Sequence, residues 1–301
     1  MTTTLTAPTT SMFGTQIPHG TSATDALGLV GMDWTVSSEP VYLEHGKQIP
    51  SARAIVSSLG TPLAVVGPNY TPTQNSTVAG IVQRICDHAG FTLDTIGAAK
   101  NGRYLWWLLN GGETSFGGDH TLPYMLVTNS HDGKSALTVT PTSKRVICSN
   151  MIASAKRGRV STRWLHTSGA VSDEWVDGVT DGWRSGIDAD KAVSDQLASI
   201  ECNHERCQRL WLAVYEDTCG TVDETDDRRK ARWIDAAQTM SDTFDSERGQ
   251  GCQPSMWLAY NAATNWVQHH YGRSGNSREW STLMGRRRQI SSHAIHRALS
   301  I

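Results

Sequence analysis

The residues best suited to contact a nucleic acid are the cations of one long stretch without acidic side chains. Between Gly133 and Ser172 there is no Asp or Glu, and there are seven basic residues: Lys134, Lys144, Arg145, Lys156, Arg157, Arg159 and Arg163. Lys and Arg neutralise backbone phosphates, and aromatic rings among them stack on bases. The stretch therefore predicts an anion-binding surface, with Trp164 and the more distant Tyr70 as stacking residues. The alternative is a solvated positive face, or an intramolecular partner for the acidic segment 173–247.

A second kind of chemistry is nucleophilic catalysis by Cys148. This cysteine ends a predicted strand just before a predicted helix, where the helix dipole and Arg145 would favour the thiolate. His131 or His166 could act as the base, and Asp132 could orient it. The competing interpretation makes Cys148 a small buried strand residue and places Asp132 in a hairpin turn. We favour this second interpretation, and with it a protein that is not an enzyme.

The spacing Cys202-x-His204-x-x-Cys207, with Cys219 further along the chain, has the ligand types of a zinc site. The surrounding residues have helical periodicity, however, and helix positions two and five residues apart do not share a face. The sequence also lacks a glycine-rich phosphate loop, a zinc-protease helix and a carboxylate-rich nuclease signature. We therefore predict no metal site and no cofactor.

Composition limits the remaining classes of protein. The chain has 301 residues, a formal net charge of −2 and six scattered cysteines, which are too few for a disulfide framework. No apolar run approaches the ~20 residues of a membrane-spanning helix, and no Lys or Arg precedes Lys47, so we expect neither a membrane span nor a secretory signal. These features predict a cytoplasmic protein with reduced thiols. The basic C-terminal end contains Arg286, Arg287 and Arg288, which could extend the basic surface or form a flexible tail.

The N-terminal half has the signals of a sheet. Residues 1–24 are rich in Thr, Ser, Pro and Gly and predict a disordered arm. Short β-prone runs follow, and residues 76–90 have the apolar spacing of a helix that ends at Gly90. Trp106 and Trp107 lie on one predicted strand and should point to opposite faces, so at most one of them should be fully buried.

The stretch that carries the basic residues combines a hairpin and a helix in this prediction. Asp132-Gly133 is the preferred pair for a tight hairpin turn of the mirror-image type, because both residues tolerate positive φ. Pro141 should end the second strand of the hairpin. Residues 149–158 should form a helix that ends on Lys156 and Arg157, where cations suit the helix dipole.

The C-terminal part is predicted to be helical after a Gly- and Asp-rich connection that begins at residue 173. Apolar residues at helical spacing occur in 193–214, 233–244, 257–267 and 290–299. Strands that precede helices without alternation indicate an α+β fold, with a mainly antiparallel sheet in the N-terminal half. We expect a disordered arm at 1–24, a mainly β core at 25–172 and a helical region at 173–301 that packs on the core.

Several short phrases of the sequence are informative as a set. They are Val66-Gly-Pro-Asn69-Tyr70, Gln74-Asn75, Tyr124, Ser130-His131-Asp132-Gly133, Pro141, Arg145-Val-Ile-Cys148-Ser-Asn150, His166-Thr167, Trp257, Tyr260-Asn261-Ala262 and Thr264. Together they resemble a phage- and plasmid-borne protein family known as a domain of unknown function, the 932 type. The resemblance covers 31–298 and implies a phage or plasmid gene in a bacterial host cell. It transfers no catalytic residues, because the family has no settled activity.

The functional expectation is a protein that binds single-stranded DNA, or anneals it during recombination or replication, as a homo-oligomer. Backbone contacts would come from the cations between Lys144 and Arg163, with Trp164 or Tyr70 stacking on bases. Two alternatives remain open at this point. One is a transferase or hydrolase that uses Cys148 with His131 or His166, and the other is a host-interaction protein without catalysis.

Overall fold

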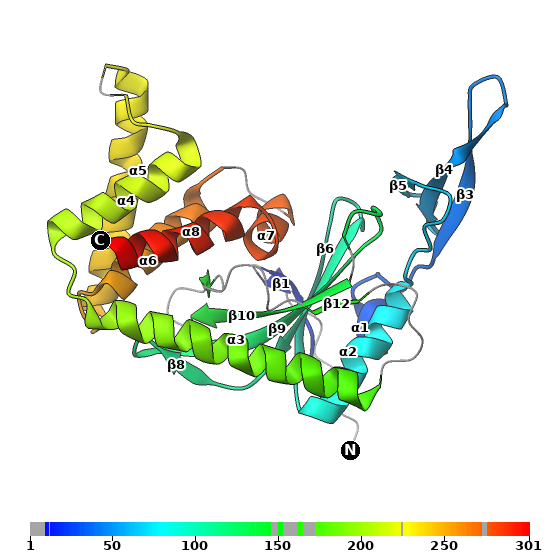
Figure 1. Ribbon diagram of the computed structural model, residues 1–301, viewed down its shortest axis with the longest axis horizontal. Coiled ribbons are helices and arrows are strands. Elements are labelled where there is room, and N and C mark those ends of the chain that lie inside the picture. Colours follow the sequence, from blue (N-terminus) through cyan, green and yellow to red (C-terminus); the bar gives the residue numbers. More distant parts are fainter. Residues whose placement is uncertain are drawn as a thin grey trace. The chain divides into compact units, whose positions relative to one another are not determined.

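The computed structural model describes residues 10–11, 13–135, 137–145, 150–152, 162–164, 172–223, 225–272 and 276–301. Strands dominate the N-terminal half and helices the C-terminal part, as Figure 1 shows. The strand pairs whose register is described are antiparallel. The predicted α+β fold is therefore confirmed.

The larger sheet has the strand order β1-β2-β6-β7-β9-β10-β11, with β8 paired to β9 and β12 paired to β10. Its strands are β1 (Thr10–Ser11), β2 (Gly14–Gln16), β6 (Thr92–Ala99), β7 (Tyr104–Asn110), β8 (Thr114–Phe116), β9 (Asp119–Ser130), β10 (Leu137–Arg145), β11 (Met151–Ile152) and β12 (Thr162–Trp164). The five central residues of β7 are all buried. A strand that is apolar on both sides belongs in the middle of a sheet whose two faces are covered.

The helices are α1 (Ala23–Leu29), α2 (Asn75–Ala89), α3 (Asp173–Ser199), α4 (His204–Cys219), α5 (Asp227–Gly249), α6 (Met256–Asn265), the π-helix η1 (Trp266–His270), α7 (Asn276–Leu283) and α8 (Arg286–Ser300). The predicted end of α2 is confirmed, because Gly90 follows it in the left-handed conformation with a φ of 76°. Glycine adopts that conformation without steric cost.

The chain divides into two compact units, and each is made of several segments. Unit 1 comprises Met1–Gly112, Tyr124–Pro141 and Arg159–Arg184, and unit 2 comprises Glu113–Pro123, Thr142–Gly158 and Ser185–Ile301. The strands β9 and β10 and the helix α3 each contribute residues to both units. α3 begins just after the expected boundary at 172/173, and unit 1 continues into this helix as far as Arg184.

Unit 1 has its core between the larger sheet and the helices α1 and α2. Val78, Val82 and Ile85 recur at helical spacing on α2 and pack in the same cluster as Trp107 of β7. The N-terminal turns of α3 add Val176 and Val179 to this cluster. The apolar face of each helix is therefore the sequence feature that builds this core.

The region expected to be a disordered arm is partly ordered. Among its described residues, Phe13 and Ile17 are buried, Gly14–Gln16 form β2, and α1 begins at Ala23. The carbonyl oxygen of Phe13 accepts a hydrogen bond of 2.8 Å from Nε1 of Trp106. The prediction of a disordered arm to residue 24 is therefore wrong from residue 13 onward, because this segment covers part of the sheet.

The same contact explains why both tryptophans of β7 are fully buried. Trp107 faces the main core cluster, while Trp106 packs against Gly97 of the neighbouring strand, where an added Cβ atom would lie 2.1 Å from the indole ring. Both side chains have an exposed fraction of 0%. The expectation that at most one would be buried is wrong, because strand alternation says nothing about what covers each face.

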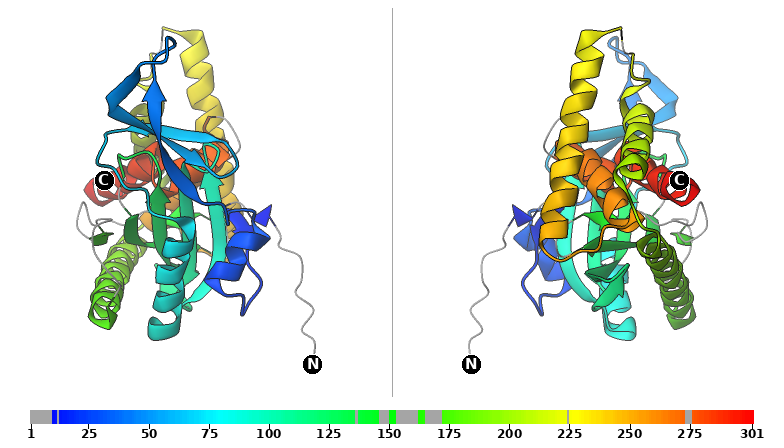
Figure 2. Two further views of the ribbon diagram at one scale, coloured as in Figure 1. Left: turned by 90° about the vertical axis from the view of Figure 1, so that its right-hand side faces the viewer. Right: turned by 90° about the vertical axis from the view of Figure 1, so that its left-hand side faces the viewer.

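A smaller sheet of unit 1 contains β3 (Val36–Tyr42), β4 (Gln48–Ser57) and β5 (Pro62–Val66) in that order. Among the described residues, its buried cluster contains Val36, Ile55 and Leu63. The hairpin of β3 and β4 extends away from α1 and α2 in both Figure 1 and Figure 2. Most of this sheet is therefore open to solvent.

The predicted hairpin at Asp132-Gly133 has a different turn. β9 and β10 are neighbours in the sheet, as expected, but six residues separate Ser130 from Leu137. Gly133 has a φ of 71°, whereas Asp132 is not among the described residues with positive φ. The prediction of a two-residue turn of the mirror-image type is therefore wrong. Asp132 instead stabilises a longer turn through hydrogen bonds to its carboxylate.

Two further predictions in this stretch are wrong. β10 continues through Pro141 to Arg145, and Met151–Ile152 form the strand β11 where the helix 149–158 was expected. β11 pairs with β10 through Ser143↔Ile152 and Lys144↔Met151. Tertiary pairing thus determines the conformation at a position where local capping signals favoured a helix. Lys156 and Arg157 lie outside the described residues.

The expected connection after residue 173 is the first part of α3, a helix of 27 residues. Val176, Val179 and Trp183 have helical spacing and pack in unit 1. Each intervening glycine destabilises the helix by only about 1 kcal/mol relative to alanine. The burial of the three apolar side chains outweighs this cost. In the part of the chain that the structure describes, no helix has the length and apolar character needed to cross a membrane.

Candidate functional site

The structure does not gather the predicted nucleic-acid-binding cations on one surface of its described part. Lys156, Arg157 and Arg159 lie outside the described residues. Arg163 and Trp164 belong to β12, which pairs with β10, and only their backbone is described. Lys144 is half-buried on β10.

Arg145 is buried instead of exposed, so its predicted phosphate contact is wrong. Its side chain has an exposed fraction of 0%. Nε donates a hydrogen bond of 2.8 Å to Oδ2 of Asp119, and Nη2 donates one of 2.9 Å to Oε2 of Glu247. Two carboxylates thus satisfy the guanidinium inside unit 2, and burial without such partners would be prohibitively unfavourable.

Asp119 also contacts the aromatic residue at the start of α6. Nε1 of Trp257 donates a hydrogen bond of 2.6 Å to Oδ2 of Asp119, and the guanidinium carbon of Arg145 lies 5.8 Å from the centre of the indole ring. Gly117 is close to the same ring, because a Cβ atom there would lie 2.6 Å from it. The positive φ of 57° and this close approach together require glycine at that position.

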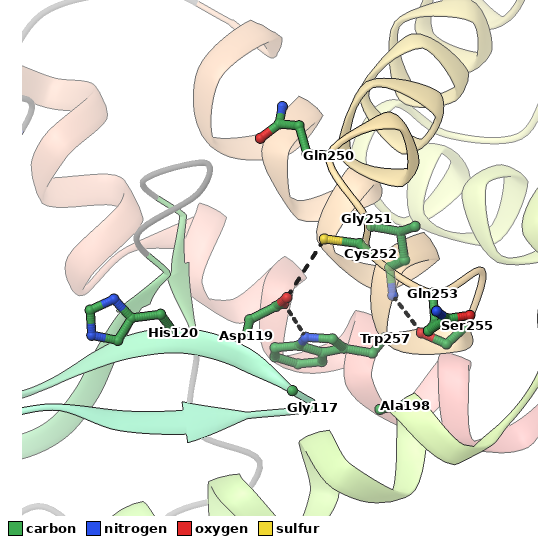
Figure 3. A pocket seen from close by; sticks show the side chains of 12 residues that line it. Gly117, Asp119, His120, Ala198, Gln250, Gly251, Cys252, Gln253, Ser255 and Trp257 are labelled. Atoms are coloured by element: carbon green, nitrogen blue, oxygen red, sulfur yellow. Dashed lines mark hydrogen bonds between the residues drawn. The ribbon is translucent and has the colours of Figure 1, made fainter.

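A cavity of about 640 Å³ lies beside this cluster in unit 2. Figure 3 shows Asp119, Cys252 and Trp257 converging on it, with Gln250 and Gln253 nearby. The Sγ atom of Cys252 lies 3.8 Å from Oδ1 of Asp119. Burial and the negative charge of Asp119 raise the pKa of this thiol, so Cys252 does not have the character of an activated nucleophile.

A polar network in unit 2 surrounds Asn150. Its Nδ2 donates to the carbonyl oxygen of Asn261 over 3.0 Å, and its Oδ1 lies 3.0 Å from Nε2 of His269. Burial lowers the pKa of His269 to about 4, and the nearby positive charges of His270 and Arg278 add to this effect. The imidazole is therefore neutral at pH 7 and serves as a fixed hydrogen-bonding group.

His131 and Asp132 do not form the predicted catalytic pair. His131 is fully buried, with Nε2 3.0 Å from Oδ1 of Asn75 and its ring 5.5 Å from that of Trp34. The Asp132 carboxylate accepts hydrogen bonds from the Tyr104 hydroxyl, the Ser130 hydroxyl and two backbone amides, those of Lys134 and Ser135. Both side chains stabilise the loop after β9. Cys148 and His166 lie outside the described residues.

Two basic turns of unit 1 lie side by side, and we call them the basic turn pair. They are the β6–β7 turn, 100–103, and the β9–β10 turn, 132–135. The backbone N of His131 donates to the carbonyl oxygen of Arg103 over 2.9 Å, and the hydroxyl of Tyr104 donates to Asp132 over 2.7 Å. Tyr70 joins them, because its hydroxyl donates to the carbonyl oxygen of Ser130 over 3.3 Å.

The cations of the basic turn pair are accessible. Lys100 and Lys134 are exposed and Arg103 is half-buried. No ion pair among the described residues includes any of the three. Nε of Arg103 is buried and has no hydrogen-bond partner among the described residues. The exposed lysines of the pair therefore offer positive charge to an anion.

Sequence reasoning named Tyr70 as a stacking residue and counted Lys134 in the acid-free stretch without assigning it a backbone contact, and it missed Lys100 and Arg103. The signal that could have found them is Asn101-Gly102, a preferred hairpin-turn pair that a cation flanks on each side. The structure has positive φ at Asn101 and Gly102, as such a turn requires, and at Lys100 as well. Such signals locate each turn along the chain. They do not show that the cations of the two turns meet, because that depends on the order of the strands in the sheet.

The remaining predicted clusters have structural roles. The Sγ atoms of Cys202 and Cys207 are neighbours, and no group of metal-ligating side chains occurs among the described residues. Arg286 donates to the carbonyl oxygen of Thr218, and Arg288 donates to that of Leu283. Arg287 donates to the carbonyl oxygen of Val267, in η1, over 2.9 Å. The three arginines therefore begin the helix α8 and do not form a flexible tail.

A family model described as Domain of unknown function (DUF932) matches residues 62–300. This match confirms the resemblance that the sequence phrases indicated. No curated protein and no solved structure matches the chain. Several residues that carry the resemblance lie in the buried networks described above, including Asn75 and His131 in unit 1 and Arg145 and Asn150 in unit 2.

Replacing Arg145 by Ala should destabilise the protein by about 3–5 kcal/mol, because two carboxylates would lose their buried partner. The matched control is Arg297→Ala, which removes an arginine whose side chain is 54% exposed and paired with Asp217. That change should cost no more than about 1 kcal/mol. Urea denaturation of both variants provides the measurement, and equal losses would contradict the role of Arg145.

The contribution of Asp132 should depend on pH. Burial by itself would raise the pKa of this carboxyl, but the hydrogen bonds that it accepts outweigh burial and lower the pKa below its ordinary value of 3.8. The stabilisation is therefore present above that value and is lost as the pH falls through the lowered pKa.

The unfolding free energies of the wild type and of Asp132→Asn, measured between pH 7 and 3, should differ most at neutral pH and converge in acid. The control is Asp33→Asn, at an exposed position where the carboxylate has no hydrogen-bond partner among the described residues. A difference between wild type and Asp132→Asn that stays constant with pH would refute the assignment.

Proposed function

Because the chain belongs to the DUF932 family, whose description assigns no activity, we propose a function from the geometry of unit 1: it binds single-stranded nucleic acid, with DNA favoured. The observation that carries this proposal is the basic turn pair. Three cations there form no ion pair among the described residues, and a tyrosine ring lies beside them.

Electrostatics supports a phosphate backbone as the ligand. The turns contribute Lys100, Arg103 and Lys134. The Asp132 carboxylate accepts four hydrogen bonds, from Tyr104 of β7, from Ser130 of β9 and from two backbone amides of its own turn. Each phosphate that a cation contacts releases counterions, which provides affinity without sequence specificity. A backbone that crosses both turns would therefore meet cations from two strand connections that are distant in sequence but adjacent in space.

Tyr70 is well placed to add a stacking contact. Its hydroxyl donates to the carbonyl oxygen of Ser130, and its Cδ2 atom would lie 3.8 Å from a Cβ atom at Gly133. The ring is half-buried and held at one end. An aromatic ring fixed in this way loses little conformational freedom when a base stacks on it, and such stacking contributes about 1–3 kcal/mol per base.

The sequence assigns a second, separate set of cations to the same role. Lys156, Arg157 and Arg159 lie in the acid-free stretch between β11 and β12, and Arg163 pairs with Thr138 through the backbone of β12. Lys144, half-buried on β10, and Trp164 complete the set that the sequence assigns to this role. Arg145 is removed from it, because its guanidinium is inside unit 2.

Self-association is the second part of the proposal, because annealing proteins must hold several strands together. The smaller sheet of unit 1 exposes apolar side chains on or near its edges, with Leu59 72% and Val65 68% exposed. Val65 lies on β5, an edge strand of that sheet. Exposed apolar edge strands favour pairing with another chain. We propose that a phage or plasmid gene encodes this protein and that it acts as an oligomer in the bacterial cytoplasm.

The test is a titration of fluorescent single-stranded oligonucleotide over a salt series. Wild type should bind at low salt, and log Kd should change with log salt concentration. The double variant Lys100→Ala/Lys134→Ala should bind more weakly, and its salt slope should be smaller by about 0.7 for each phosphate that the variant no longer binds.

The matched control removes two exposed cations of unit 1 that already have carboxylate partners, Arg84 and Arg184. The variant Arg84→Ala/Arg184→Ala has the same net charge as the test variant and should bind much like the wild type. The proposal fails if the wild type does not bind at low salt, or if both double variants lose the same affinity.

A further inference from the structure

We infer that Cys202 and Cys207 of unit 2 form a redox-active pair, which a peroxide converts into a disulfide. Both residues are free cysteines, and their Sγ atoms lie 2.7 Å apart. The reaction involves no residue of the basic turn pair in unit 1, so it does not depend on the proposed binding of nucleic acid. Three features of the pair support this assignment: its position on the chain, the contact between the sulfur atoms and the unequal surroundings of the two thiols.

The start of α4 brings the two cysteines together. Asn203 is the N-cap of this helix, because its side chain accepts a hydrogen bond from the backbone N of Arg206. Cys202 directly precedes the cap, and Cys207 follows it by four residues. Side chains at these two positions pack against each other in the hydrophobic staple, which fixes the direction in which the chain enters a helix. The two cysteines are therefore adjacent even though positions five apart within one helix do not share a face.

The contact between the sulfur atoms favours a disulfide over a shared metal ion. Two thiolates that bind one zinc ion tetrahedrally at about 2.3 Å are about 3.8 Å apart, which is farther than the sulfur atoms of this pair. Within the described residues, no group of three or more His, Cys, Asp or Glu side chains is arranged to hold a metal ion. A disulfide requires only that the two sulfur atoms approach each other to about 2.05 Å.

Cys202 is the member of the pair that becomes a thiolate more readily. The Cys207 thiol donates a hydrogen bond to its sulfur, and the positive charge of Arg206 assists, so the pKa of Cys202 is lowered although burial opposes this. The partial positive charge at the start of α4 favours a thiolate in the same way. The same hydrogen bond and burial raise the pKa of Cys207. Cys202 is therefore the nucleophile, and Cys207 keeps its proton until it reacts with the oxidised Cys202.

The other described cysteines do not have this activation. Burial raises the pKa of Cys86 to about 11, and it also raises the pKa of Cys219 and of Cys252. Reactivity toward an oxidant follows thiolate character as well as exposure. Cys202 should therefore react before Cys219, even though Cys219 is the exposed one.

A small oxidant can reach the pair from solvent. Cys202 has an exposed fraction of 6%, and the residues on either side of it, Glu201 and Asn203, are exposed. Hydrogen peroxide is only slightly larger than water, so it needs little space to approach this sulfur. In the proposed cytoplasmic setting thiols are kept reduced, and the disulfides that do form there are usually transient and catalytic or redox-sensing. The pair would therefore be reduced at rest and oxidised on exposure to peroxide.

The reaction takes two steps. In the first, the Cys202 thiolate attacks one oxygen atom of hydrogen peroxide, the O–O bond breaks, and a sulfenic acid and hydroxide are formed. This hydroxide takes up the proton that Cys202 had released. In the second step the sulfur of Cys207 attacks Sγ of Cys202, the S–O bond breaks, and the leaving hydroxide takes the proton of Cys207. The two thiols are thereby oxidised to one disulfide, and the peroxide is reduced to two molecules of water.

Peptide mapping of the full-length protein tests the inference, because trypsin separates the two cysteines. Cleavage after Lys191, Arg206 and Arg209 gives the peptides 192–206 and 207–209, each with one cysteine of the pair. The protein is treated with hydrogen peroxide, its remaining thiols are alkylated, and the digest is analysed by mass spectrometry without reduction. We expect the two peptides as one linked species before Cys219 is oxidised, and dithiothreitol should separate them.

Trapping with dimedone, which reacts with sulfenic acids, identifies the nucleophile. In wild type that is oxidised in the presence of dimedone, the adduct should be on peptide 192–206. Cys207→Ala should give no linked species and severalfold more adduct at Cys202, because no second thiol consumes the sulfenic acid. The matched control is Cys219→Ala, which removes an exposed cysteine and should form the linked species as wild type does. Circular dichroism verifies that each variant is folded.

The inference is overturned if the two peptides stay unlinked at a peroxide concentration that oxidises Cys219, or if no linked species forms at millimolar peroxide. It is also overturned if Cys202 or Cys207 is linked to a different cysteine, or if the dimedone adduct is found mainly on peptide 207–209. Zinc that is retained by wild type and lost from Cys202→Ala would assign the pair to a metal site instead. Oligonucleotide binding should be the same in Cys202→Ala as in wild type, so each of the two proposals can fail without the other.

Discussion

The buried guanidinium of Arg145 is the interaction on which unit 2 depends most. It connects the last residue of β10 with Asp119 at the start of β9 and with Glu247 near the end of α5. Trp257 donates to the same Asp119 oxygen and brings in the start of α6. Arg145 therefore holds β9, β10 and α5 together directly, and α6 joins them through Asp119. The removal of this cation from water is tolerable only because both carboxylates are in place.

Unit 1 uses a carboxylate in a comparable way. Asp132 accepts hydrogen bonds from its own turn and from Tyr104 of β7, so the turn after β9 has a defined position relative to the turn before β7. His131 adds a buried contact with Asn75 of α2. The residues that resemble catalytic groups in the sequence thus position the loops that hold Lys100 and Lys134.

The sequence predicted those elements whose position depends on a local pattern of residue types. Apolar spacing indicated α2 with its end at Gly90, and the order of strands and helices indicated the α+β class. It could not predict features that depend on distant partners. Arg145 looked like a surface cation because the sequence does not show that Asp119 and Glu247 meet it. The glycine-rich start of α3 looked like a connection, since its stability comes from packing of Val176 and Val179 in unit 1.

In the proposed function, single-stranded DNA lies across the basic turn pair. The most direct measurement is photo-crosslinking of an oligonucleotide that contains 5-iododeoxyuridine, followed by mass spectrometry of the crosslinked peptides. We expect crosslinks at Tyr70 or Tyr104, the aromatic residues that hydrogen-bond to residues 130 and 132 beside the two turns. Crosslinks confined to peptides of unit 2, with none from unit 1, would contradict this placement of the DNA.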